Sequence, residues 1–296
     1  MSRSLDPKVA TRTNSPGQRP GCLSLAACFC VGLALAPAAA AEREKPLFEL
    51  GLAGGGGYLP DYPAAGQNHA HAIALPFFAY RGEVVRSDEK GLLRGRLVRT
   101  DRVELDVSLN GSFAVDSDDN DVRRGMPDLD HLGEVGPRLQ ITLARAAHAA
   151  KIDLELPVRA VFSTDFSQLD FRGFTFAPQL AYQHDRFFDP TTAFKFGIGP
   201  IFATVELMEY FYEVPRPFAT AGRRAYAASA GYLGTRIEAS TVGEIWPRVT
   251  GFLGGRIDFH RGAANDDSPL FRERTTYTIG AGLILSLVQS AQRVVE

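Results

Sequence analysis

In the stretch KIDLELPVRAVFS, residues 151–163, apolar and polar residues alternate. Apolar side chains occupy alternate positions from Ile152 to Phe162, while Asp153, Glu155 and Arg159 lie between them. Successive side chains of a β-strand point to opposite faces, whereas a helical pattern repeats about every 3.6 residues. We therefore predict a strand with one apolar and one polar face.

The same alternation recurs along most of the chain, and helical spacing is scarce. It is clear in VELDVSLNGSFAV (103–115), RLQITLA (138–144) and TTYTIGAGLILSL (275–287). On this basis we predict about twelve strands. Their predicted ranges are 47–58, 69–80, 82–87, 91–98, 101–115, 134–146, 150–163, 173–185, 191–204, 224–238, 244–260 and 274–288.

The lengths of these strands and of their connections favour a membrane barrel over a soluble β-sandwich. Strands of about ten residues or more suit a tilted membrane span of about 9–11 residues, whereas soluble strands average about 5–6. Long polar connections follow alternate strands, and short turns follow most of the others, as in outer-membrane barrels. The long ones are 59–68, 116–133, 164–172, 205–223 and 261–273. We predict an all-β, closed antiparallel transmembrane β-barrel with long external loops and short periplasmic turns.

Aromatic residues and prolines fit the same prediction. PFFAY (76–80), RFF (186–188) and MEYFY (208–212) place aromatics near strand ends, where membrane barrels carry interfacial girdles. Proline cannot donate a ladder hydrogen bond, so prolines within these segments are expected at strand ends or bulges. They are Pro76, Pro137, Pro157, Pro178, Pro200 and Pro247.

The N-terminal segment reads as an export signal. Basic residues precede an apolar run at 22–36, and the small-residue string PAAAA (37–41) follows. We predict a signal peptide over 1–41, removed near Ala40 or Ala41, and a single barrel domain over 42–296. LAAC (25–28) leaves lipoprotein processing open as an alternative. All three cysteines lie within this leader, which excludes disulfides and thiol chemistry in the mature chain.

Charged residues on the polar faces of the strands are the candidate functional residues. Their mixed signs predict a salt-bridged lumen or a narrow pore, and the net charge of -2 gives no reason to expect a nucleic-acid partner. The residues predicted to face the lumen are Glu104, Asp106, Glu134, Arg138, Asp153, Glu155, Arg159, Arg236, Arg248 and Arg256.

The sequence offers little for catalysis or metal binding. His69 and His71 share one strand face but have no nearby third ligand, and the acidic run DSDDND (116–121) lacks the spacing of an EF-hand. No nucleophile elbow is present. We therefore predict no catalytic residue, no cofactor and no metal site, and we expect a protein that is not an enzyme. An embedded hydrolase is the least supported alternative.

The stretch RRGMPDLDHLGEVGP, residues 123–137, is acidic and glycine-rich between two alternating segments. Its single histidine has no second histidine or nucleophile beside it. We interpret it as the descent from an external loop into a strand, with Gly125 turning the chain. Leu129 and Leu132 are expected to pack against the barrel rim.

Several segments together resemble the MipA/OmpV family of outer-membrane proteins. The resemblance spans about 45–288 and is most specific over 125–137. It rests on GLAGGGGYLPDYPAA (51–65), PFFAYRG (76–82), GMPDLDHLGEVGP (125–137) and TTYTIGAGLILSL (275–287).

The resemblance implies a location, partners and a role. It implies a monomeric barrel in the Gram-negative outer membrane, in contact with lipid and lipopolysaccharide. It further implies a scaffold, because the founding member is described as binding a lytic murein transglycosylase and a bifunctional penicillin-binding murein polymerase. It supplies no catalytic residues. A narrow channel for small polar solutes is the alternative function.

Overall fold

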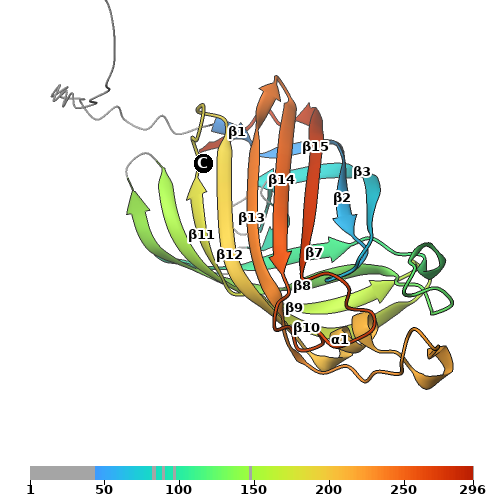
Figure 1. The fold of residues 1–296 in the computed structure, drawn as a ribbon. Helices are drawn as coiled ribbons and strands as arrows, with labels where there is room; N and C mark the ends of the chain where they lie inside the picture. Colours follow the sequence, from blue (N-terminus) through green and yellow to red (C-terminus); the bar gives the residue numbers. More distant parts are fainter. Residues whose placement is uncertain (1–43, 82–84, 89–90, 96–97, 147–148, 296) are drawn as a thin grey trace, which may run out of the picture. The chain divides into compact units, whose positions relative to one another are not determined.

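The computed structural model describes residues 44–81, 85–88, 91–95, 98–146 and 149–295, and the predicted signal peptide lies outside them. The described chain is almost entirely β-structure (Figure 1). None of its helices is long and apolar enough to cross a membrane. The strands are β1 (Glu44–Pro46), β2 (Phe48–Pro60), β3 (Asn68–Arg81), β4 (Val85–Asp88), β5 (Gly91–Gly95), β6 (Val98–Arg99), β7 (Val103–Ser112), β8 (His131–Ala146), β9 (Ala150–Thr164), β10 (Leu169–Phe176), β11 (Gln179–His184), β12 (Ala193–Ala203), β13 (Gly231–Trp246), β14 (Val249–Phe259), β15 (Thr275–Gln289) and β16 (Arg293–Val295). The helical segments are η1 (Ser117–Asp119), α1 (Val205–Tyr212) and η2 (Arg216–Phe218).

Fourteen of the strands form one antiparallel sheet, and β1 pairs with β16 in a separate two-stranded sheet. The order in the large sheet is β5-β4-β3-β2-β15-β14-β13-β12-β10-β9-β8-β7-β6, with β11 between β9 and β12. The path therefore begins and ends on β5 and β6, which are separated in sequence only by residues 96–97. β5 also lies beside β7.

The sheet has one apolar and one polar face, as the alternation predicts. On β15, Tyr277, Ile279 and Leu283 are exposed on one side, while Thr276 and Ser286 are buried on the other. The register carries this division across neighbouring strands, since cross-strand partners lie on the same side of a sheet. Ile279 is paired with Tyr58, and Leu285 with Leu52, on the apolar face.

Antiparallel pairing places the connections alternately at two ends of the sheet. The long connections 61–67, 113–130, 204–230 and 260–274 gather with α1 at one end, which we call the loop end (Figure 1). The turns 185–192 and 247–248 lie at the other, the turn end, where β1 and β16 pair. The connection 165–168 is a tight turn at the loop end, shorter than the predicted 164–172. There the Gln168 amide, with Ser167, hydrogen-bonds to Asp165 and lowers its pKa to about 2.

The predicted boundaries were wrong at several places, two of which involve prolines. The hairpin between the strands predicted at 224–238 and 244–260 turns at Pro247 and Arg248, so β13 runs on to Trp246. Pro247 cannot donate to the ladder and Arg248 adopts φ 67°, which together end the strand there. The strand predicted at 173–185 is divided at 177–178 into β10 and β11, because Pro178 also lacks an amide donor.

The larger hydrophobic core of the described chain lies among the long loops and the adjoining strand ends. Leu207, Met208, Phe211 and Tyr212 of α1 are all buried, which follows from their spacing on one face of the helix. They pack with side chains from the other loops and from the loop ends of β9, β12 and β13. Those side chains are Tyr62, Ala65, Val115, Met126, Leu129, Val161, Ile201, Ala203, Val214, Leu233 and Leu270. We call the four long loops, held by this core, the loop cap.

Candidate functional site

Glu155 is the centre of an ion-pair network on the polar face. Its side chain is 3% exposed, and its Oε2 atom lies 2.9 Å from Lys195 Nζ and 3.6 Å from Arg138 Nη1. Gln179 and Gln183 also donate to its two oxygens, at 3.0 and 3.2 Å. β9, β11 and β12 are neighbouring strands, and their alternation places all of these side chains on one face. Such a buried carboxylate needs this number of partners to offset its lost hydration.

Two further carboxylates on the same face are held in the same manner. Arg138 donates to both oxygens of the buried Asp106, at 2.9 and 2.5 Å. Arg159 donates from Nε to Glu134 at 2.8 Å, and Thr175 donates to the same oxygen at 2.9 Å. Each pair joins cross-strand or near-neighbour positions, so the strand register selects the partners.

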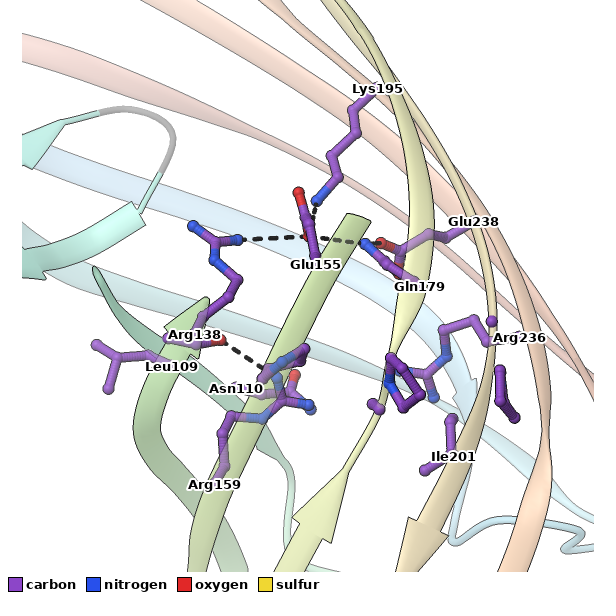
Figure 2. Close-up of a pocket in the computed structure, with 16 residues that line it drawn as sticks. Leu109, Asn110, Arg138, Glu155, Arg159, Gln179, Lys195, Ile201, Arg236 and Glu238 are labelled. Atoms are coloured by element: carbon purple, nitrogen blue, oxygen red, sulfur yellow. Dashed lines mark hydrogen bonds and ion pairs between the residues drawn. The ribbon is translucent and has the colours of Figure 1, made fainter. Parts of the chain in front are cut away.

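A cavity of about 170 Å³ lies within this network. Figure 2 shows Arg138, Glu155 and Lys195 converging on one side of it, with Arg236 and Glu238 on another. Four cationic and two anionic side chains line it, namely Arg138, Arg159, Lys195, Arg236, Glu155 and Glu238. Three of the cations are also paired with carboxylates outside the lining, which are Asp106, Glu134 and Asp258. The arrangement suits a small polar guest.

The structure places most of the predicted lumen residues on this polar face. The register relates Glu104, Asp106 and Arg138 across β7 and β8, and Arg236 and Arg256 across β13 and β14. Arg248 is a correction, because it lies exposed in the turn at the end of β13, outside the ladder. The others on the polar face are Glu134, Asp153, Glu155 and Arg159.

Several residues of the network were missed in the sequence. Lys195 binds Glu155, and Asp258 accepts two hydrogen bonds from Arg236, at 2.7 and 3.1 Å. Both residues alternate with apolar neighbours, Lys195 in AFKFGIGP and Asp258 in RIDFH. Extending the same two-residue period along these strands would have identified them.

Side-chain hydrogen bonds lock the loop cap together. Tyr62 donates to the carbonyl of Leu270 and Tyr212 donates to the carbonyl of Pro63, both at 2.8 Å. Asn120 donates to Asp61 at 2.6 Å. Burial raises the pKa of Tyr212 well above its ordinary value, so the hydroxyl stays a donor at any physiological pH. The cap therefore joins connections far apart in the sequence.

Two arginines bind the 113–130 loop to the 204–230 loop. Arg123 is buried, which lowers its pKa by desolvation, and it donates to the carbonyls of Pro127 and Phe211 at 3.0 and 3.4 Å. Arg223 donates to the carbonyl of Val122 at 2.7 Å and to that of Phe218 at 2.9 Å. Each guanidinium satisfies carbonyl groups that the loop backbone leaves without ladder partners.

Removing Arg223 is expected to loosen the cap and leave the sheet intact. Arg223→Ala deletes the bonds to Val122 and Phe218, and hydrogen bonds to a charged group contribute about 1.5–3 kcal/mol. We expect chymotrypsin to cleave 204–230 at least about tenfold faster. Arg224→Ala is the matched control, since Arg224 is exposed beside Asp267. Equal cleavage of the two variants would contradict the latch assigned to Arg223.

The histidines serve packing and hydrogen bonding. His69 Nδ1 lies 2.6 Å from the buried Asp61, and the His71 ring stacks on Phe113 at 4.7 Å between centroids. His260 Nδ1 must donate to the Leu233 carbonyl at 2.9 Å, so Nε2 accepts from Thr276. Burial lowers the pKa of His260, which favours this neutral form. Across the described residues, no three histidine, cysteine, aspartate or glutamate side chains form a metal-binding group.

Comparison with known proteins gives a family match. A family model described as MltA-interacting protein MipA matches residues 52–286. No curated protein matches the chain.

Solved structures similar to the chain include three outer-membrane proteins. The NanC porin in a rhombohedral crystal form is 8% identical over 80% of this chain and 100% of that one, with a TM-score of 0.38. An outer membrane channel of Pseudomonas putida F1 is 10% identical over 85% and 99%, with a TM-score of 0.44. A bacterial polysaccharide outer membrane secretin is 10% identical over 81% and 99%, with a TM-score of 0.35.

Proposed function

The chain belongs to the family of MltA-interacting protein MipA, and from this premise we propose that it is an outer-membrane β-barrel acting as a scaffold for murein enzymes. The apolar face of the sheet carries the membrane part of the proposal. Its large side chains are exposed along the strands, including Leu52, Leu253, Ile279 and Leu283. A soluble sheet would cover such a face, whereas lipid covers it in a membrane barrel.

Aromatic side chains near both ends of the strands support the same placement. At the turn end, Trp246 and Phe188 are 65% and 81% exposed. At the loop end, Phe166 is 84% exposed, and the rings of Tyr58 and Tyr277 contact each other on the apolar face. Aromatic residues favour the two membrane interfaces, so these positions fit girdles on either side of an aliphatic band.

Closure of the sheet into a barrel is part of this proposal. The two edge strands β5 and β6 are consecutive in the chain, and β5 lies beside β7. An open sheet in lipid would leave edge N–H and C=O groups without partners, at several kcal/mol each. The large sheet has fourteen strands. If β5 and β6 are counted as one interrupted strand, and β10 and β11 as another, the number of strands is twelve, in line with the predicted number of about twelve.

The packed polar face and the packed loop end favour a scaffold over an open channel. Ion pairs cross the polar face, and its cavity is only about 170 Å³. At the loop end, the cap is a packed hydrophobic core with interlocking hydrogen bonds. Free diffusion of solutes would require this core to open. The murein role follows the family description, which names MltA as the partner of the family's namesake.

Conductance in planar bilayers separates the scaffold from the channel. We expect the intact protein to give no discrete current steps, because the cap blocks the loop end. A variant in which a short glycine-serine linker replaces residues 205–229 should give steps, since α1 supplies much of the cap core. Heat-dependent gel mobility would verify that both proteins are folded. Robust steps from the intact protein would instead favour the channel for small polar solutes.

Direct binding tests the proposed partner. Purified, folded protein is expected to bind a purified lytic murein transglycosylase of the MltA type through the turn end. Shortening the exposed 185–192 turn, which carries Phe188, should weaken binding at least about tenfold if this turn is a contact. The Arg224→Ala variant, altered at the loop end, is the control. Absence of binding by the intact protein would refute the scaffold.

A further inference from the structure

Two buried polar atoms of neighbouring strands lack a hydrogen-bond partner within the described residues. They are Arg256 Nε and Thr278 Oγ1. The two residues are cross-strand partners on β14 and β15, so their side chains lie together on the polar face. An unsatisfied buried donor costs about 1–3 kcal/mol. Two such groups side by side point to a missing partner common to both.

Arg256 lies among carboxylates, but none of them accepts a hydrogen bond from its Nε atom. Its ion pair with Asp258 is long, 3.6 Å from Nε to Oδ2, and Arg236 holds the same carboxylate with two hydrogen bonds. Glu238 is the cross-strand partner of Arg256, yet no ion pair within 4 Å joins them in the described chain. Glu238 accepts instead from Gln179, at 3.2 Å. Arg256 Nε is thus a donor without an acceptor among the described residues.

On β14 and β15, the polar face next to Arg256 and Thr278 carries no polar side chain at the next two positions toward the turn end. The next same-face residue is Gly254 on β14 and Gly280 on β15, and these two are cross-strand partners. The following pair is Phe252 and Gly282. The register continues from Gly280 and Gly282 to Gly57 and Gly55 on β2. This glycine wall supplies no side chain that could partner the two atoms.

Apolar side chains border the glycine wall on the same face. Phe252, Ile73 and Leu75 are 41%, 47% and 43% exposed on the face that also carries the ion pairs. The Phe252 ring lies close over Gly282, where an added Cβ would come within 2.3 Å of ring atoms. Lipid contact on the other face cannot explain these side chains. An apolar guest would remove their surface from water.

We propose that the interior binds an amphiphilic oxyanion, a small carboxylic acid with an apolar body. The carboxylate accepts hydrogen bonds from Arg256 Nε and Thr278 Oγ1, and Arg236 adds positive charge nearby. The apolar body lies along the glycine wall against Phe252, Ile73 and Leu75. A carboxylate would form a stronger, charge-assisted hydrogen bond with Arg256 than a neutral guest would. This site does not depend on the murein role, since any folded preparation would carry it.

Titration calorimetry on the full folded chain in a nonionic detergent tests the site. The probe is 4-phenylbutyrate, which is water-soluble, and 4-phenylbutyramide is its neutral counterpart. We expect saturable binding of the acid and at least about tenfold weaker binding of the amide, as for loss of a charge-assisted hydrogen bond. Equal affinities, or no saturable binding of the acid, would overturn the proposal.

Three variants locate the binding on the structure. Arg256→Gln should weaken binding of 4-phenylbutyrate at least about tenfold. Arg248→Gln, the same change in the exposed turn of the same hairpin, should leave this affinity unchanged. Gly254→Val should also weaken binding of 4-phenylbutyrate, because the valine side chain would occupy the position proposed for the apolar body of the ligand. A Cβ there meets Ser240 at an ordinary 3.4 Å, so the strands tolerate it. Gel mobility checks folding, and an Arg256→Gln protein that is folded and binds like the parent would refute the assignment.

Discussion

Glu155→Gln is expected to lower the free energy of unfolding by about 3–5 kcal/mol, the cost of breaking a buried ion pair. The substitution keeps the size of the side chain and removes its charge. Lys195 and Arg138 would then face each other's charge with no carboxylate between them. The measurement is urea unfolding in lipid vesicles, followed by gel mobility.

An exposed ion pair provides the control for Glu155. Asp170 is 56% exposed and lies 3.1 Å from Arg172 at the loop end of β10. Asp170→Asn removes one negative charge, as Glu155→Gln does, and surface pairs contribute only about 0–1 kcal/mol. If Glu155→Gln and Asp170→Asn lower the free energy of unfolding by similar, small amounts, Glu155 is not the centre of the ion-pair network.

Leu253→Arg is expected to destabilise the protein in bilayers by about 2–4 kcal/mol. Leu253 lies near the middle of β14 on the apolar face and is 52% exposed. A membrane at that face would have to accommodate the charge in its hydrocarbon layer. The equilibrium between folded and unfolded protein in vesicles of saturated phosphatidylcholine measures the effect.

The control for Leu253 moves the same charge to the other face. Ser240 is exposed on the polar face of β13, two strand positions from Glu238. Ser240→Arg should cost less than about 1 kcal/mol, within the usual range of substitutions away from packed sites. Similar effects of the two arginines would mean that the apolar face does not contact lipid.

The alternation in the sequence predicted the strands well because a sheet with unlike faces requires a period of two. The residues 151–163 form β9 as expected, and Leu129 lies in the core near the strand end. Boundaries were less predictable at Pro247 and Arg248. The tight turn forms there because Arg248 adopts a positive φ. The alternation of apolar and polar residues is compatible with several turn positions, so it does not show where one strand ends and the next begins.

The candidate site was predictable only in part, since alternation assigns a side chain to a face and does not assign its partner. Glu155 and Arg159 are on the predicted face, but their partners Lys195 and Glu134 lie on different strands. The pairing follows from strand order and register, which depend on all the connections together. The core of the loop cap was missed for the same reason, because its residues show no common period.

The β-class, the two unlike faces, the division into long loops and short turns, and the family could all be predicted from the amino-acid sequence. Each of these is a local pattern of side chains along the chain. The folded structure was needed to show that the loops interlock through Arg223 and Tyr212, and that Arg256 Nε and Thr278 Oγ1 have no hydrogen-bond partner among the described residues. Those contacts join residues far apart in sequence or on separate strands, and their energies depend on distances that only the folded chain fixes.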